Sequence, residues 1–238
     1  SHYDEVFNPS ISKYNSKSGA CFVEVNMGPQ PPTQHKGRIP PFYGRDNMEE
    51  LQRKFDDLAE KGVFRRPQEV GVTVENINPS FLVRKQSSNE KRLVTDFGSI
   101  SSYCRPTPTL MPDVESTLRK ISSWKFLIKS DFTEAYFQIP LKKSSMKYCG
   151  VVSPTKGVLV YTVGCMGLPG TEVALEELTC LLFGELVLQG KVAKMADDVF
   201  ISSATVQELA NNFEEVLGIL QENNLRLSSR MTVIAPQS

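Results

Sequence analysis

Three aspartates stand out in this chain of 238 residues, because their types and spacing could bind divalent metal ions. Asp131 follows the β-prone run 124–128, and the dipeptide Asp197-Asp198 precedes the β-prone run 199–201. An Asp-Asp pair between short β-prone runs predicts the turn of a hairpin. Three carboxylates on adjacent strands would form a hard, oxygen-rich site, which suits Mg²⁺ and two-metal displacement at phosphorus. The structural alternative is that each aspartate only caps a helix or makes a turn.

Four segments carry the functional signal together, because a short motif taken alone is a common chance match. They are Arg92–Phe97, Ser130–Gln138, Gly164–Pro169 and Met195–Asp198. With these segments in this order, the chain resembles a reverse transcriptase, most closely those of gypsy-like LTR retrotransposons and more distantly those of retroviruses. The resemblance covers nearly the whole sequence. It assigns the first segment to the fingers and the other three to polymerase motifs A, B and C.

The resemblance implies a catalytic site built on the aspartates. Asp131, Asp197 and Asp198 would be catalytic and would bind two Mg²⁺ ions, for which Mn²⁺ could substitute. The carbonyl of Phe132 would complete one metal shell. The implied reaction is attack of a primer 3′-hydroxyl on the α-phosphorus of a dNTP, in which metal charge and positioning do most of the work.

The same resemblance implies a dNTP site beside these carboxylates. Arg92 would grip the triphosphate, because a planar guanidinium donates two parallel hydrogen bonds. Tyr136 would be the steric gate against a ribose 2′-hydroxyl, although its helical spacing with Phe132 and Ile139 is equally that of a core residue. The full set of implied dNTP-binding residues is Lys85, Arg92, Glu134, Ala135, Tyr136, Met166 and Gly167.

Methionines replace the family's usual residues at three places. Met166 stands where relatives carry Gln or Phe, and Met195 stands where many carry Tyr. Met231 lies near the point where a lysine usually protonates the leaving pyrophosphate, and the adjacent Arg230 is a poor proton donor. These departures leave a second interpretation open, namely a catalytically decayed or domesticated binding scaffold. A third, a nucleotide cyclase or other polymerase on a similar palm, leaves the Arg92 and motif B segments unexplained.

The charge and cysteine content restrict the other classes. The 27 basic residues balance 27 acidic ones, whereas a nucleic-acid binder usually has a basic footprint, so the lysines and arginines must be segregated if the chain binds nucleic acid. The five cysteines are scattered without a Cys-x-x-Cys, which argues against structural zinc and a disulfide framework. No apolar run approaches the roughly 20 residues of a membrane span, and no signal segment is visible.

The expected elements alternate between strands and helices, which predicts an α+β fold. Apolar spacing predicts four helices. The first would be capped by Asp46 or Asn47 and stopped by Gly62, and the second would open at Pro112-Asp113. The third would be capped by Thr171 and stopped by Gly184, and the fourth would begin with a capping box of Thr205 and Glu208. Alternation and turn residues predict hairpins within 80–97, 147–163 and 192–201, with single strands at 124–131 and 225–234.

The domain order follows from the resemblance. Residues 1–45 are expected to be an extended arm, since five prolines between 29 and 41 disfavour a long helix. Residues 46–123 would be mainly fingers, and residues 124–238 mainly palm, an antiparallel sheet with helices packed on one face. In the family the thumb, connection and RNase H domains lie beyond such a point. The implied partners are a primed RNA or DNA template, dNTPs and those polyprotein domains, in cytoplasmic virus-like particles.

Overall fold

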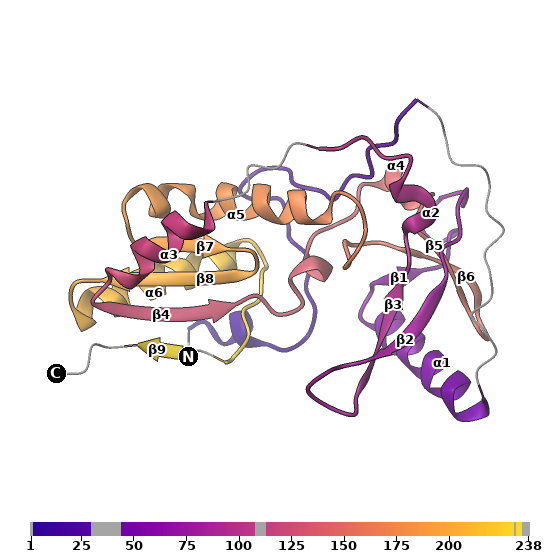
Figure 1. Cartoon of the computed structure of the whole chain (residues 1–238), viewed down its shortest axis with the longest axis horizontal. Coiled ribbons are helices and arrows are strands. Elements are labelled where there is room, and N and C mark those ends of the chain that lie inside the picture. Colours follow the sequence, from indigo (N-terminus) through magenta and orange to yellow (C-terminus); the bar gives the residue numbers. More distant parts are fainter. Residues whose placement is uncertain (1, 30–43, 108–112, 231, 235–238) are drawn as a thin grey trace. The chain divides into compact units, whose positions relative to one another are not determined.

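A computed structural model of the chain describes residues 2–29, 44–107, 113–230 and 232–234. Contacts divide the chain into two compact units (Figure 1). Unit 1 comprises Ser1–Cys21, Pro108–Ile139 and Glu172–Ser238, and unit 2 comprises Phe22–Thr107 and Pro140–Thr171. The units therefore interleave along the chain. Of the earlier expectations, Met231 and much of the proline-rich arm lie outside the described residues.

Unit 1 is built on one four-stranded antiparallel sheet, with strand order β7-β8-β4-β9. The strands are β4 (Phe126–Asp131), β7 (Val192–Met195), β8 (Asp198–Ser203) and β9 (Thr232–Ile234). The hairpin of β7 and β8 and the central position of β4 are visible in Figure 1. Because the β7–β8 loop is only two residues long, the register of this hairpin is fixed by its turn.

Helices lie on both faces of this sheet. Residues alternate between the faces, so Leu127, Ala193 and Phe200 share one face, where Ile121 and Trp124 pack against them. Ile121 belongs to α3 (Val114–Ser122), whose N-terminus is capped by the side chain of Asp113. Helices were predicted on one face only, and α3 is the exception.

The two long helices cover the opposite face. In α6 (Val206–Glu222), Thr205 caps the first turn by accepting from the Glu208 N–H, as the sequence predicts. The buried apolar residues of α6 contact β4 and β8. In α5 (Thr171–Leu188), Glu176 pairs with Lys194 of β7, whose side chain is on the face away from Leu127 and Phe200.

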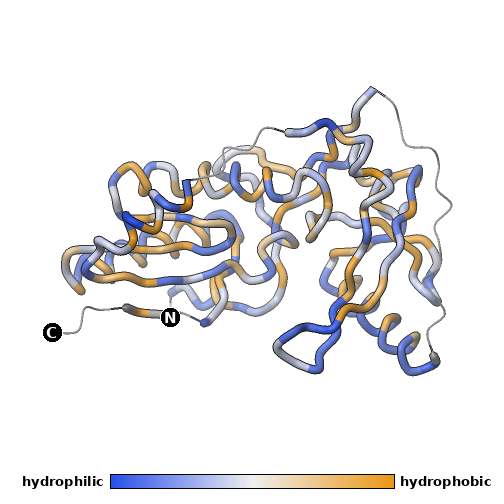
Figure 2. Tube along the Cα trace, in the orientation of Figure 1, coloured by the Kyte–Doolittle hydropathy of each residue, from blue (hydrophilic) through white to orange (hydrophobic). Residues whose placement is uncertain are grey.

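Unit 2 contains a three-stranded sheet, a hairpin and one long helix. The sheet has order β1-β6-β5, with β1 (Phe64–Arg65), β5 (Gly150–Ser153) and β6 (Gly157–Tyr161). The hairpin pairs β2 (Ser80–Arg84) with β3 (Lys91–Thr95), and its hydrophilic tip stands out in Figure 2. The helix is α1 (Arg45–Glu60). An aromatic core of Phe55, Phe64, Phe97 and Tyr161 joins these elements, with neighbouring ring centroids 4.6–5.7 Å apart.

Four short helical turns complete the described elements. They are η1 (Asp4–Phe7), α2 (Gly98–Ser101), η2 (Ala135–Gln138) and α4 (Lys143–Met146). Among the described residues no helix is both long and apolar enough to cross a membrane.

Three element boundaries differ from the sequence expectation. The first helix begins at Arg45 after Gly44, without a side-chain cap from Asp46 or Asn47. Helix α5, which was predicted to stop at Gly184, continues to Leu188. Its buried apolar residues extend to Leu186, so packing outweighs the poor helix propensity of one glycine. The final strand is a bridge at Leu227 followed by the short β9.

Candidate active site

Two of the three predicted carboxylates form a cross-strand pair. Asp131 is the last residue of β4 and Asp198 is the first residue of β8, and the register places them directly opposite each other. Directly opposed side chains in an antiparallel pair share a face and have Cβ atoms about 5 Å apart. The exposed Lys129 precedes Asp131 by two residues and shares that face. The sheet therefore brings both carboxylates to one end of its Leu127 face.

Asp197 lies in the turn that leads into this pair. Met195 pairs with Asp198, so Ala196 and Asp197 form a two-residue hairpin loop, in which Ala196 has φ of 55°. Positive φ at the first loop residue matches the turns that suit the right-handed twist of hairpins. The Phe132 N–H donates to the Asp197 carbonyl at 3.1 Å, which fixes the turn against the end of β4. The backbone of Asp197 therefore lies beside that of Phe132, the residue that follows Asp131.

The carboxylates also interact electrostatically. Burial raises the pKa of Asp198, Lys129 opposes that rise, and the charges of Asp197 and Asp131 add to it. Among the described residues, however, no group of three or more Asp, Glu, His or Cys side chains is arranged so that it could hold a metal ion. The fold thus places Asp131 opposite Asp198, with Asp197 in the adjoining turn. That their side chains gather around a cation remains a prediction.

The strand segment 226–228 borders Asp131 on its other side. The Ser228 N–H donates to the Asp131 carbonyl at 2.8 Å, and the Thr133 N–H donates to the Arg226 carbonyl at 3.2 Å. Phe132 forms an antiparallel bridge with Leu227 between these two bonds. The Phe132 side chain is buried, with its ring centroid 6.5 Å from that of Phe183 in α5. Residues 131–133 are therefore held by backbone bonds from both sides.

The turn after β4 carries the predicted steric gate. Tyr136 lies in η2 and is partly buried, and its pKa is raised by burial, then by the negative charges of Glu172 and Asp197. The Tyr136 hydroxyl is thus within electrostatic range of the hairpin turn. Glu134 precedes η2 in the left-handed region with φ of 46°, and Ala135 begins η2. Sequence reasoning missed Glu172, because an acidic residue in a first helical turn has an ordinary capping explanation.

The predicted triphosphate contacts lie in unit 2, on the β2–β3 hairpin. Arg92 pairs with Val83, so Arg92 and Lys85 share one face of the hairpin, while Lys91 is on the other face. Lys85 forms an ion pair with Glu90 at 2.9 Å, and Lys91 forms one with Glu50 of α1 at 2.8 Å. Arg92 is exposed. The two predicted cations are therefore on the same surface of one hairpin.

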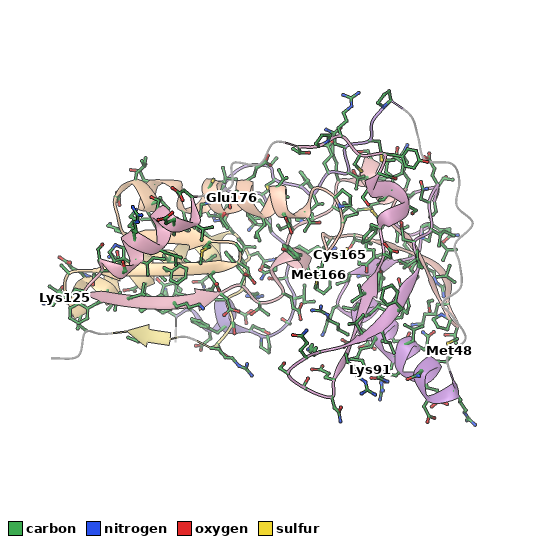
Figure 3. All side chains as sticks on the ribbon, in the orientation of Figure 1. Met48, Lys91, Lys125, Cys165, Met166 and Glu176 are labelled. Atoms are coloured by element: carbon green, nitrogen blue, oxygen red, sulfur yellow. The ribbon has the colours of Figure 1, made fainter. Side chains whose placement is uncertain are left out.

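The motif B segment of unit 2 lies before α5 and exposes Met166 and Gly167, while Gly164, Cys165 and Leu168 are buried. Figure 3 labels Cys165, which is buried, and Met166, which is 50% exposed. Gly167 has φ of 82°, and a Cβ added there would meet no atom within 4 Å. Gly170 has φ of 91°, and a Cβ there would lie 2.2 Å from the Glu24 carbonyl oxygen. Gly170, which was not among the predicted site residues, is therefore required by close packing, while Gly167 is favoured by its backbone angle alone.

A cleft of about 580 Å³ in unit 1 is separate from the carboxylates. Its walls come from the turn before β4, the α5–β7 turn, the end of β8 and α6, and they include Trp124, Lys125, Lys191 and Asn212. Asp131 and Asp198 lie at the opposite ends of β4 and β8. The cleft is thus not the site that the three aspartates would form.

No protein-family model matches the sequence, but a curated relative is similar to it. The relative is a retrovirus-related Pol polyprotein from transposon opus of Drosophila melanogaster, 23% identical over 231 residues. The alignment covers 95% of this chain and 22% of the relative, so the chain spans about a fifth of the relative's length.

Solved structures share the fold. A foamy viral protease–reverse transcriptase in complex with an RNA/DNA hybrid has a TM-score of 0.80 at 17% identity, covering 98% of this chain and 30% of that one. The native prototype foamy virus protease–reverse transcriptase has a TM-score of 0.77 at 15% identity, covering 100% and 32%. The foamy viral enzyme in complex with double-stranded DNA has a TM-score of 0.73 at 18% identity, covering 95% and 45%. The sequence match and the shared fold together relate this chain to the reverse-transcriptase region of retroelement Pol polyproteins.

Proposed function

We propose that this chain is the fingers–palm region of an RNA- and DNA-directed DNA polymerase encoded by a retroelement polyprotein. The observation that carries the proposal is the pairing of Asp131 with Asp198 across β4 and β8, with Asp197 in the adjoining turn. Two acidic residues directly opposite each other destabilise a sheet, so their placement calls for a cation. A purely structural turn would need only one of the three aspartates.

The donor set fits Mg²⁺ in its chemistry. Carboxylate oxygens are the hard ligands that Mg²⁺ prefers, and Asp131, Asp197 and Asp198 would hold the two ions with help from the Phe132 carbonyl. When bound, such ions activate the attacking 3′-hydroxyl and neutralise charge on the transferring phosphoryl group. The raised pKa of Asp198 reflects its burial, which Lys129 partly offsets, and the negative charges of Asp197 and Asp131, and a bound cation would relieve this repulsion.

The remaining site residues would bind and select the nucleotide. Arg92 and Lys85, on one face of the β2–β3 hairpin, would contact the triphosphate, and Lys85 would first have to leave Glu90. Tyr136 would exclude a 2′-hydroxyl by steric clash, with Ala135 giving the sugar room. Met166 and Gly167 form an exposed turn that could approach a nucleotide or template.

The proposed partners are a primed template and the rest of a polyprotein. Two solved structures of similar fold are complexes of foamy viral protease–reverse transcriptase, one with an RNA/DNA hybrid and one with double-stranded DNA. For this chain we propose the same classes of nucleic acid, together with thumb and RNase H domains and assembly in cytoplasmic virus-like particles. Primer–template affinity would depend on those further domains.

A non-catalytic scaffold is the second candidate. Met195 stands at the end of β7, where it packs against the apolar cluster of Leu127, Ala193 and Phe200 instead of presenting a phenol at the site. Lys85 is engaged by Glu90 instead of being available to a triphosphate. Both observations are consistent with a protein that keeps the fold but has lost catalytic activity.

Primer extension separates the two candidates. The 238-residue chain is incubated at high concentration with dNTPs, Mg²⁺ or Mn²⁺, and a primer annealed to an RNA or a DNA template. The polymerase proposal expects metal-dependent extension on both templates that Asp197→Asn abolishes. Asp46→Asn, at an exposed aspartate of α1, is the matched control and should extend like the parent chain. Metal-independent product, or none from the parent chain when supplied with its downstream domains, would favour the scaffold.

A further inference from the structure

Gln138 is a buried polar residue at the end of the turn that carries Tyr136. Its relative exposure is 1%, although its side chain ends in an amide. Buried amides must find hydrogen-bond partners, because an unsatisfied donor or acceptor inside a protein is costly. Gln138 is therefore in place for a reason other than apolar packing.

The amide of Gln138 forms three hydrogen bonds to backbone partners from two segments. The Arg226 N–H donates to Gln138 Oε1 at 2.7 Å, and Gln138 Nε2 donates to the Arg226 carbonyl at 3.0 Å. Nε2 also donates to the carbonyl of Thr133. Because a backbone N–H can only donate, the atom facing it must be the amide oxygen, which fixes the orientation of the side chain.

These bonds make the Gln138 side chain substitute for a strand neighbour at Arg226. The Thr133 N–H also donates to the Arg226 carbonyl, and the Ser228 N–H donates to the Asp131 carbonyl. The amide thus closes a loop that begins at Asp131, passes through the turn carrying Tyr136 and returns to the strand segment beside Asp131. The turn cannot shift against that segment without breaking bonds to Gln138.

We propose that Gln138 is a positioning residue that fixes Tyr136, and with it sugar selection, relative to Asp131. This inference rests on the proposed polymerase function. It adds to that function a residue that touches neither nucleotide nor metal and acts through the Thr133–Gln138 turn. The residue type follows from the geometry, because two donor bonds and one acceptor bond on one neutral side chain of this length require glutamine.

Residues 226–228 are also held by contacts with the N-terminal segment, which makes the role of Gln138 testable. The Leu227 N–H donates to the Val6 carbonyl at 2.8 Å, and Arg226 forms an ion pair with Glu5 at 3.2 Å. Removing the amide of Gln138 should therefore release the turn while residues 226–228 stay docked on the N-terminal segment. We therefore expect the variant to fold, but with the turn that carries Tyr136 displaced relative to Asp131.

The test replaces Gln138 with methionine, which has a similar length and no amide. Gln138→Glu, which keeps the acceptor for the Arg226 N–H, is the second variant in case the first folds poorly. Gln207→Met, at an exposed glutamine of α6, is the matched control. Two readouts are compared with the parent chain, namely amide hydrogen exchange at Arg226 and Phe137 without nucleotide, and the ratio of dNTP to rNTP incorporation.

Gln138→Met should speed exchange at both amides and lower the dNTP to rNTP ratio about tenfold or more, since small misplacements at a site cost rate steeply. Gln207→Met should change neither. Faster exchange with unchanged sugar selection would overturn the positioning role, and so would unchanged exchange in a folded variant. If the parent chain extends no primer, the proposed function fails on its own, and the exchange rates still decide whether Gln138 holds the turn.

Discussion

Asp131 and Asp198 face each other as the final cross-strand pair of β4 and β8, and the negative charge of Asp131 is one of the causes that raise the pKa of Asp198. Without a cation such a pair destabilises the folded chain, so its role is in catalysis and not in stability. Replacing either residue should therefore separate activity from stability.

Asp131→Asn and Asp198→Asn should each lower primer extension about 10²-fold or more, because losing a metal ligand forfeits several kcal/mol of charge stabilisation. The measurement is single-turnover extension at saturating Mg²⁺ and primer–template. Asp46→Asn provides the control for a general loss of negative charge. Near-parental extension by either variant would contradict a two-metal site at this pair.

The metal-free chain should show the opposite effect on stability. Because the folded-state pKa of Asp198 is raised by burial and by Asp197 and Asp131, the folded chain holds this proton more tightly than the unfolded chain does. That contribution to stability is present in acid and is lost as the pH rises through the folded-state pKa. Asp198→Asn should therefore have a higher Tm than the parent at neutral pH in EDTA, with a smaller difference near pH of about 4. An equal difference at both pH values would mean that the charge of Asp198 is not the cause.

Tyr136→Ala or Tyr136→Val should admit ribonucleotides, because removing the ring opens space at the sugar. The comparison is the ratio of dNTP to rNTP incorporation for each variant. Phe137→Ala is the paired control in the next position of η2, and it should reduce stability more than selectivity. Looser sugar selection from Phe137→Ala with none from the Tyr136 variants would show that the motif A register is wrong.

Met231→Lys should raise the chemical rate, because a lysine there would supply the missing general acid, which is typically worth about 10²-fold or more. The neighbouring exposed Arg230 makes Arg230→Lys the necessary parallel variant. Pre-steady-state rates at saturating dNTP, measured with the downstream domains present, isolate the chemical step from primer binding. No change from either lysine would mean that proton donation at this segment does not limit turnover.

Gly170→Ala should destabilise the chain by about 3 kcal/mol or more, since its Cβ would lie 2.2 Å from the Glu24 carbonyl oxygen in a backbone with positive φ. Gly167→Ala is a well-matched comparison, because its φ is also positive but nothing lies within 4 Å of the added Cβ. It should cost only about 1 kcal/mol, the strain of the left-handed region. Chemical denaturation measures both. Equal losses would show that the contact with Glu24 relaxes cheaply.

Local sequence signals were sufficient for several elements. Thr205 with Glu208 predicted the start of α6, and Asp113 predicted the start of α3, because capping is settled by groups within one turn. The Asp197-Asp198 dipeptide predicted the hairpin for the same reason. The path of α5 through Gly184 was missed, because packing along the whole helix outweighed one local signal.

The sequence by itself determined which residues could do chemistry, since residue type and order are written in it: the three aspartates, Tyr136, Arg92 and Lys85. Only the tertiary structure decided that Asp131 meets Asp198, that Lys129 shares their face, and that Lys85 is paired with Glu90. It alone also gave Gln138 and Gly170 their roles, because the partners of these residues lie 88 and 146 positions away in the chain. Register, burial and close approach depend on contacts between distant segments, and no local pattern encodes such contacts.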